Sequence, residues 1–358
     1  MRWVVVFLVP CFWRSAEAWC SSAPVAGLLR HEARRETRAV GFPSARGWYR
    51  RHTSAQSQWR QQQQHSGVRT GAGKAGMAAA MTSSSEMDVV DGDIVVVVGA
   101  SGGVGRLVTQ SLAATGKYKV KGLVRNLEKA KGALADGEGL ELELVQGNIV
   151  DEESLNAAMK NAACVVACTG TTAFPSARWG SGNTPDAVDN VAVGNMLRAA
   201  ASPSNHPDGG KLKRFVLLSS VGVERADKFP FVILNAFGVL DAKAKGEEAV
   251  RRAAEEGGFS FCIVRPGQIK GDPFSSYSAS GVKSTAAGTE GASGKAPKRM
   301  VSLRQGDEEA GDVNPSSVAA VFTQAVGQPG AAGKSFTVVN VLGTDPTQGE
   351  WDTIFSEL

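Results

Sequence analysis

The sequence has 358 residues, of which 42% are hydrophobic and 21% are charged, with a formal net charge of +4. This length and composition predict a globular protein with one large core or two smaller ones. The charge is uneven: residues 1–80 hold 12 Lys and Arg against 3 acidic residues, and the remainder holds 27 against 32. The predicted folded part is therefore mildly acidic, which disfavours a nucleic-acid-binding surface.

The N-terminal segment has the composition of targeting sequences. Residues 1–18 predict a secretory signal peptide, because an apolar run over 3–13 precedes the small residues around a cleavage site at 16–18. The run is shorter than the roughly 20 residues that span a bilayer. Residues 19–88 are rich in Arg, Ser, Ala and Gln and predict a disordered, transit-peptide-like segment. The two segments together predict a bipartite plastid presequence, with ordinary secretion as the alternative.

From residue 89 onward, apolar runs alternate with helical patterns, which predicts a doubly wound α/β fold with a mostly parallel sheet and helices on both faces. We expect one domain over 89–358, with small C-terminal elements on the substrate side. The segment 275–298, rich in Ser, Gly, Ala and Thr, predicts a flexible loop, either an active-site lid or a surface insertion. The predicted strands are 94–98, 118–124, 141–146, 164–168, 213–219, 259–264 and 335–341, and the predicted helices include 103–115, 151–160, 315–327 and 351–358.

A glycine-rich turn follows the first predicted strand. Gly99, Gly102 and Gly105 stand at GxxGxxG spacing between four valines and an amphipathic helix. The first glycine permits the tight turn, the second lets main-chain N–H groups approach a pyrophosphate, and the third allows close packing of helix on strand. This context predicts dinucleotide binding, with a purely structural turn as the alternative.

The second predicted strand ends at Arg125, where an NAD-selective site usually has an acidic residue for the ribose hydroxyls. A guanidinium group pairs well with a 2′-phosphate. The position therefore favours NADP over NAD, unless Arg125 is only an exposed strand-end arginine.

Other chemistries lack the residues they need. Cys164 and Cys168 fall on one predicted strand, where four residues span about 13 Å, beyond the roughly 4.4–6.8 Å that a disulfide allows. These two cysteines are predicted to be buried small hydrophobic residues, and Cys262 is the third cysteine of the folded part. His206 is the only histidine after the presequence, so neither a histidine triad nor a metal site is expected.

A series of motifs then indicates a family. The stretches CTGTTAFPSARW, NTPDAVDNVAVGNML, LLSSVGV, NAFGVL, IVRPGQIKGDPFSSY and FTVVN occur in this order. They resemble atypical short-chain dehydrogenase/reductases, in particular plastid NAD(P)-binding proteins of plants and algae that are similar to the NADP-binding module of the plastid inner-envelope import machinery. The resemblance covers roughly 92–358. It implies a Rossmann fold, NADP as cofactor and the plastid stroma as location.

The resemblance also implies cofactor-binding positions along the chain. Asn148 stands where the family commonly has an aspartate beside the adenine, and it keeps an acceptor oxygen but loses the charge. The implied positions are Gly99, Ser101, Gly102, Val104 and Gly105 for the phosphates, Arg125 for the 2′-phosphate, Asn148 for the adenine, Thr169 and Gly170 for the nicotinamide ribose, and Pro266 and Gly267 for the nicotinamide side.

The catalytic pair of the superfamily is incomplete. Its reductases use a Tyr four residues before a Lys, because the lysine charge lowers the phenol pKa, but Val239 precedes Lys243 at that spacing. Tyr118 and Tyr277 fall outside the helix concerned. Lys243 is left either as a ribose-binding group or as a solvated lysine. Ser220 is our candidate to hydrogen-bond a substrate carbonyl, and a satisfied strand-end hydroxyl is the alternative.

Two functional hypotheses follow. The first is an NADP-dependent oxidoreductase that acts on an unidentified small molecule. The second is a non-catalytic NADP-binding protein, either a redox sensor or an assembly factor in a plastid protein complex. RNA association is a third and weaker hypothesis, because the predicted domain is mildly acidic.

Overall fold

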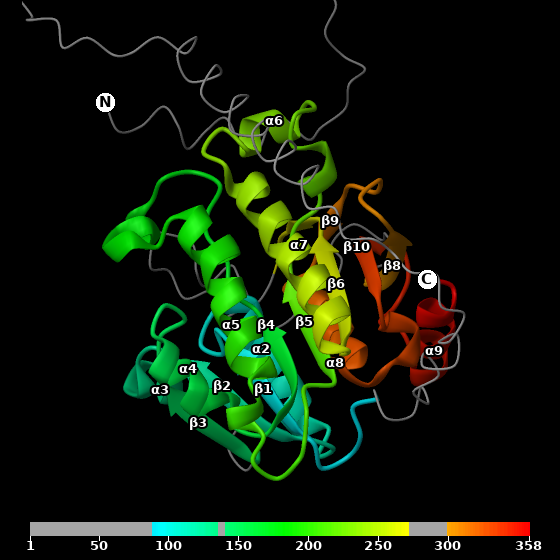
Figure 1. The fold of residues 1–358 in the computed structure, drawn as a ribbon. Coiled ribbons are helices and arrows are strands. Elements are labelled where there is room, and N and C mark those ends of the chain that lie inside the picture. The colour runs from blue at the N-terminus through cyan, green and yellow to red at the C-terminus, as the bar shows by residue number, and fades with distance from the viewer. Residues whose placement is uncertain (1–87, 135–139, 272–298) are drawn as a thin grey trace, which may run out of the picture. The chain divides into compact units, whose positions relative to one another are not determined.

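An eight-stranded sheet forms the centre of the protein, in the order β3-β2-β1-β4-β5-β6-β10-β8 (Figure 1). The computed structural model describes residues 88–134, 140–271 and 299–358. The predicted signal peptide, nearly all of the transit-like segment, the loop 275–298 and Tyr277 lie outside these residues. All neighbouring strand pairs in the sheet are parallel except β10 and β8. The predicted doubly wound, mostly parallel fold in a single domain is therefore confirmed.

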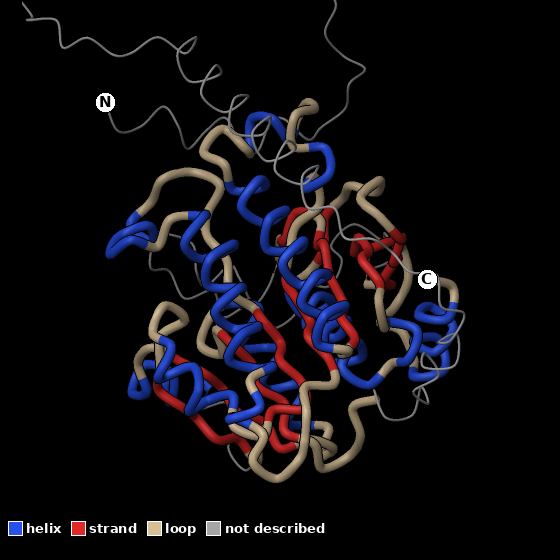
Figure 2. The backbone as a smooth tube through the Cα atoms, viewed as in Figure 1, coloured by secondary structure: helices blue, strands red, loops and turns tan. Residues whose placement is uncertain are grey.

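The elements follow the predicted alternation of strand and helix (Figure 2). The strands are β1 Ile94–Val98, β2 Lys119–Val124, β3 Leu142–Gln146, β4 Ala162–Ala167, β5 Arg214–Leu218, β6 Ser260–Pro266, β7 Gln268–Ile269, β8 Met300–Gln305, β9 Asp312–Val313 and β10 Lys334–Val341. The α-helices are α2 Gly103–Ala114, α3 Leu127–Leu134, α4 Glu152–Met159, α5 Ala192–Ala201, α6 Phe231–Leu234, α7 Val239–Gly257, α8 Pro315–Gly327 and α9 Gln348–Ser356. A π-helical turn, η4, covers Asp186–Val191 and runs directly into α5.

Alternate residues of the central strands build two cores on opposite faces of the sheet. Val95 and Val97 of β1 belong to the core beneath α2 and α8, whereas Val96 and Val98 belong to the core beneath α4, α5 and α7. Figure 1 shows α5 and α7 over the near face and α2 and α8 behind the sheet. Strands that are covered on both faces need apolar residues at every position, which explains the continuous valine run.

The structure differs from the sequence predictions mainly at strand and helix ends. β6 continues to Pro266, because its last residues are buried and paired with β10. Helix α9 begins three residues earlier than predicted, since Thr347 and Glu350 form a capping box. The antiparallel edge strand β8 was not predicted, and it pairs with β10 from Met300 to Gln305.

β1 and β4 are neighbours in the sheet, and the order of the strands along the chain changes direction between them. In open α/β sheets, ligands bind beyond the carboxyl ends of the strands at such a switch point. The residues that follow β1, β2 and β4 therefore define the candidate site.

Candidate cofactor-binding site

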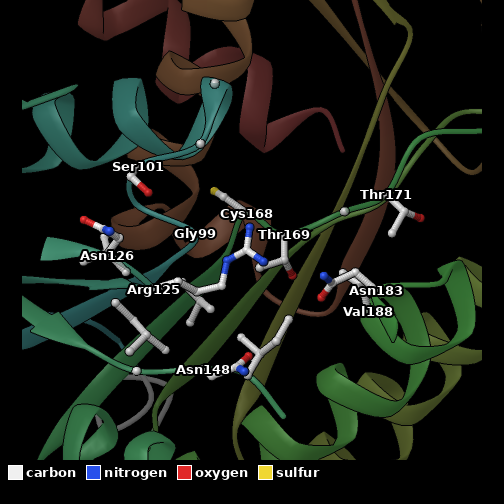
Figure 3. A pocket seen from close by; sticks show the side chains of 18 of the residues that line it. Gly99, Ser101, Arg125, Asn126, Asn148, Cys168, Thr169, Thr171, Asn183 and Val188 are labelled. Carbon is white, nitrogen blue, oxygen red and sulfur yellow. The ribbon is translucent and has the colours of Figure 1, made fainter. Parts of the chain in front are cut away.

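A cavity of about 650 Å³ opens at the carboxyl ends of β1, β2, β3 and β4 (Figure 3). Its walls come from segments far apart in the chain, which the sheet brings together. The described lining residues are Val98, Gly99, Ser101, Gly102, Gly103, Leu123, Val124, Arg125, Asn126, Lys129, Gly147, Asn148, Ile149, Cys168, Thr169, Gly170, Thr171, Asn183 and Val188. Of the eleven predicted cofactor residues, seven line this cavity.

The glycine-rich turn forms one wall. Gly99 has φ +82, a left-handed conformation that side chains rarely adopt, and its carbonyl oxygen accepts a hydrogen bond from the Gly102 N–H at 2.8 Å. A Cβ on Gly105 would overlap the Gly99 carbonyl. Gly105 and Val104 are buried in the first turn of α2, so they shape the turn without lining the cavity.

The N-terminus of α2 fits an anionic group. Its N-cap residue, Gly102, makes no side-chain capping bond, and the first turn contains no acidic residue. The unpaired N–H groups and the helix dipole favour a phosphate at this position. The loop therefore has the shape and polarity that a pyrophosphate requires.

The end of β2 adds positive charge to the cavity. Arg125 and Lys129 both line it, and Figure 3 shows the Arg125 side chain reaching into the cavity. The Asn126 side chain accepts a hydrogen bond from the Lys129 N–H at 2.8 Å, which starts α3. None of the described lining residues is acidic. Sequence analysis missed Lys129, although its position one helical turn after Arg125 could have revealed it.

Asn148 also lines the cavity, at the end that β3 forms. Its main-chain N–H donates to the Ser154 hydroxyl at 3.0 Å, and its side-chain oxygen accepts from the Val150 N–H at 3.4 Å. The residue is exposed. The loop conformation is thus fixed by local bonds, while the Asn148 amide nitrogen stays available as a donor.

A buried ion pair lies behind the opposite end of the cavity, next to the lining residues Gly170 and Thr171. The Lys243 ammonium group donates to Asp189 Oδ1 at 2.8 Å, and the side chains are only 11% and 3% exposed. The other carboxylate oxygen of Asp189 accepts bonds from the Thr171 main-chain N–H at 3.2 Å and the Thr171 hydroxyl at 2.7 Å. Lys243 is therefore not a solvated helix lysine.

Sequence analysis missed Asp189, which carries a charge at a buried position on η4. Its signal is an acidic residue beside the apolar positions of the stretch VDNVAV. Helix α7 can approach η4 closely because Gly246 has no side chain. A Cβ at this position would overlap the Asp189 carbonyl oxygen. The Lys243 ammonium group also lies 3.4 Å from the position of a Cβ on Gly170, which lines the cavity. Lys243 thus lies directly behind the cavity wall.

The two serines after β5 differ in their bonding. The Ser219 hydroxyl donates to Glu247 Oε1 at 2.6 Å, and Glu247 also accepts two bonds from Arg265, at 2.9 and 2.6 Å. Burial favours the neutral form of Glu247, but the hydrogen bonds and charge of Arg265 outweigh it and hold the Glu247 pKa below its ordinary value. The Ser220 hydroxyl donates only to the adjacent Val221 carbonyl, at 3.0 Å. Each serine thus donates its single hydroxyl proton within the protein, Ser219 to a buried carboxylate and Ser220 to a neighbouring main-chain carbonyl.

The remaining predicted positions do not line the described cavity. Pro266 and Gly267 are buried, and a Cβ on Gly267 would overlap the Gly311 carbonyl. Val239, at the position of the superfamily's tyrosine, packs in a small core with Phe231. Tyr118 lies at the amino end of β2, whereas the cavity lies at the carboxyl ends of the strands, and burial raises its pKa. Neither Ser220 nor Lys243 contacts the cavity directly, and their roles stay predictions.

In the part of the chain that the structure describes, three cysteines and His206 could have carried chemistry. Cys164, Cys168 and Cys262 are free, and burial raises the pKa of the Cys164 and Cys262 thiols to about 12. His206 bonds to the Ala200 carbonyl at 2.8 Å. Within the described ranges, no cluster of three or more His, Cys, Asp or Glu could hold a metal. None of the helices in those ranges has the length and apolar composition of a membrane span.

The fold and the cavity define a Rossmann-type dinucleotide-binding protein. The sequence model of the NAD(P)H-binding family matches residues 99–329, and the chain belongs to this family. The expected membership of an NAD(P)-binding family is confirmed at this level.

Solved structures share the fold at low sequence identity. A protein of Bacillus halodurans described as an NAD-dependent epimerase/dehydratase matches with a TM-score of 0.52 and 22% identity, covering 75% of this chain and 100% of that one. An oxidoreductase of Lactococcus lactis matches with a TM-score of 0.51 and 16% identity, covering 74% and 96%. At these identities the similarity shows the fold alone.

Curated relatives include the chloroplastic protein TIC 62. The protein of Arabidopsis thaliana is 30% identical over 203 residues, which are 52% of this chain and 29% of that protein. The protein of Pisum sativum is 31% identical over 197 residues, 51% and 34%. An uncharacterised chloroplastic protein of Arabidopsis thaliana is 29% identical over 188 residues, 50% and 60%. The aligned part spans about a third of the length of the TIC 62 relatives.

Proposed function

We propose that this protein binds NADP(H) in the cavity at the switch point and acts as an NADP-dependent oxidoreductase. The observation that carries the cofactor choice is the pair of cations, Arg125 and Lys129, at the end of β2 in a cavity whose described lining has no acidic residue. A ribose with two free hydroxyls is usually held there by a carboxylate, whereas a 2′-phosphate needs positive charge.

Different residues of the cavity bind different parts of the cofactor. The turn at Gly99 and the N-terminus of α2 hold the pyrophosphate, and Arg125 and Lys129 hold the 2′-phosphate. Thr169 and Gly170, at the end of β4, face the nicotinamide half. When bound, the cofactor supplies or accepts a hydride. Lys243 orients the nicotinamide ribose from behind Gly170, and Ser220 donates a hydrogen bond to the substrate carbonyl.

A non-catalytic role as an NADP-binding redox sensor or assembly factor is the second candidate. The observation that favours it is Val239, which fills the place of the proton-donating tyrosine and packs in an apolar core. Ser219, the other serine at the end of β5, is occupied by Glu247. Under this second proposal the protein binds NADPH without turning over any substrate.

We place the protein in the plastid. The support is the chloroplastic location in the names of its curated relatives, together with the predicted bipartite presequence. The stroma is the compartment in which an NADP-binding domain would meet its cofactor pool.

Titration with NADPH and NADH tests the cofactor choice. We expect the protein to bind NADPH at least about tenfold more tightly, because hydrogen bonds to a charged group contribute about 1.5–3 kcal/mol. Arg125→Asp should remove this preference. Arg252→Asp makes the same charge change at an exposed site on α7 and should preserve it. Equal affinities for NADPH and NADH in the unaltered protein would refute the assignment.

A further inference from the structure

Two Lys–Asp pairs join α7 to η4, and their surroundings differ sharply. Lys243 and Asp189 are 11% and 3% exposed and 2.8 Å apart. Lys245 and Asp186 lie on the same two helices, two residues after Lys243 and three residues before Asp189. They are 62% and 59% exposed and 3.4 Å apart. Burial removes the screening that water and salt give the exposed pair. Only the inner pair can exert a substantial field on a ligand in the cavity.

The inner pair is fixed before any ligand binds. Both Asp189 oxygens are engaged, one by Lys243 and the other by the two Thr171 donors. Gly246 allows the backbone of η4 to approach α7. The Asp189 carboxylate thus has no oxygen without a donor, and one of its donors is the Lys243 ammonium group at 2.8 Å. The positive charge of Lys243 is therefore offset at the cavity wall.

The pair lies behind the end of the cavity at which we expect the nicotinamide ring, the part of the cofactor whose charge changes on reduction. Arg125 marks the adenosine end, so the half of a dinucleotide that crosses the switch point toward β4 is the nicotinamide half. Thr171 and Gly170 line this end, and Lys243 lies directly behind them. The oxidised nicotinamide ring carries a positive charge that the reduced ring lacks.

We propose that Asp189 sets how the protein discriminates NADP⁺ from NADPH, by offsetting the charge of Lys243 beside the nicotinamide half of the cavity. This inference rests on the proposed cofactor site. Without Asp189, the lone ammonium group repels the oxidised ring and the protein prefers NADPH. Without Lys243, the lone carboxylate attracts the oxidised ring and the protein prefers NADP⁺.

Dissociation constants of NADP⁺ and NADPH for single and double variants test the inference. In Asp189→Asn, we expect the ratio of the NADP⁺ constant to the NADPH constant to rise about tenfold. In Lys243→Gln, it should fall by about the same factor. The double variant Asp189→Asn/Lys243→Gln should return close to the unaltered ratio, because the net charge of the pair is again zero.

The outer pair supplies matched controls. Asp186→Asn and Lys245→Gln remove the same charges from the same helices and should leave the ratio within about twofold, since exposed pairs contribute little. Ratios that stay unchanged in both inner-pair variants, while both cofactor forms bind, overturn the inference and leave the proposed function intact. A protein that binds neither form overturns both. If Asp189→Asn fails to fold, the opposite shift expected of Lys243→Gln decides the question.

Discussion

The two halves of the cavity differ in their polar groups and in whether those groups already have partners within the protein. The half around β1 and β2 consists of main-chain groups at Gly99 and Gly102 and of exposed cations, Arg125 and Lys129. The half around β4 is backed by α7, which carries buried charges that already have partners, Lys243 with Asp189 and Glu247 with Arg265. The first half offers its polar groups to a ligand. The second half uses most of its polar groups to hold itself together.

This difference favours cofactor binding over catalysis. A phosphate needs free N–H groups and cations, and the β1–β2 half presents both. A reductase needs a proton donor near the nicotinamide, and the helix that should carry one has Val239 packed in an apolar core instead. Substitutions in the two halves should therefore have different effects, on protein stability in one half and on cofactor affinity in the other.

The largest effect is expected from the buried carboxylate of Glu247, which touches Ser219, Arg251 and Arg265. Glu247→Gln removes the buried counter-charge of Arg265 and leaves only the exposed carboxylate of Glu224, 2.7 Å from the guanidinium group. We expect the free energy of unfolding to fall by about 3 kcal/mol, as measured by denaturant titration. Glu248→Gln, an exposed change on the same helix, should cost less than about 0.5 kcal/mol. An equal loss in both variants would show that the buried pair adds nothing.

The same variant predicts a pH dependence. The Glu247 pKa is lower in the folded protein than its ordinary value of 4.5, so its ionised form is stabilised by folding. The contribution is complete above about pH 4.5 and is lost as the pH falls through the folded-state pKa. The stability difference between the unaltered protein and Glu247→Gln should therefore be full at pH 7 and shrink below pH 4.5. A constant difference over this range would contradict the assignment.

The next effect concerns the β1–β2 half alone. Gly105→Ala places a Cβ against the Gly99 carbonyl, so the turn or α2 must shift. A displacement of this kind at a precisely shaped site costs on the order of a hundredfold in function, and we expect that loss in NADPH affinity. Gly132→Ala changes a helical glycine with open space around it and should leave the affinity unchanged. Similar affinities in the two variants would mean that the turn does not hold the pyrophosphate.

The sequence predicted the β1–β2 half more completely than the other half. Gly99, Gly102, Gly105 and Arg125 belong to one local motif, and local motifs are visible in a single chain. Asp189 and Gly246 are 57 residues apart and have meaning only because η4 packs on α7. Contacts of this kind depend on tertiary packing, which periodicity does not encode.

The fold shows the same division between local and distant information. The valine run of β1 and the helix that follows it were predicted closely, because burial on both faces demands apolar residues at every strand position. The edge strand β8 was missed, because its pairing with β10 joins Met300 to Val341 across a long stretch of chain. Strand pairing at such a separation has no short-range sequence signal.

Competition against bound NADPH tests the central claim most directly, because fragments of the cofactor probe each half of the cavity. Adenosine 2′,5′-bisphosphate should displace NADPH at a concentration at least about tenfold lower than 5′-AMP requires, since only the former offers a 2′-phosphate to Arg125 and Lys129. Nicotinamide mononucleotide should compete more weakly than the bisphosphate. Equal competition by 5′-AMP and the bisphosphate would contradict the assignment of this cavity to NADP.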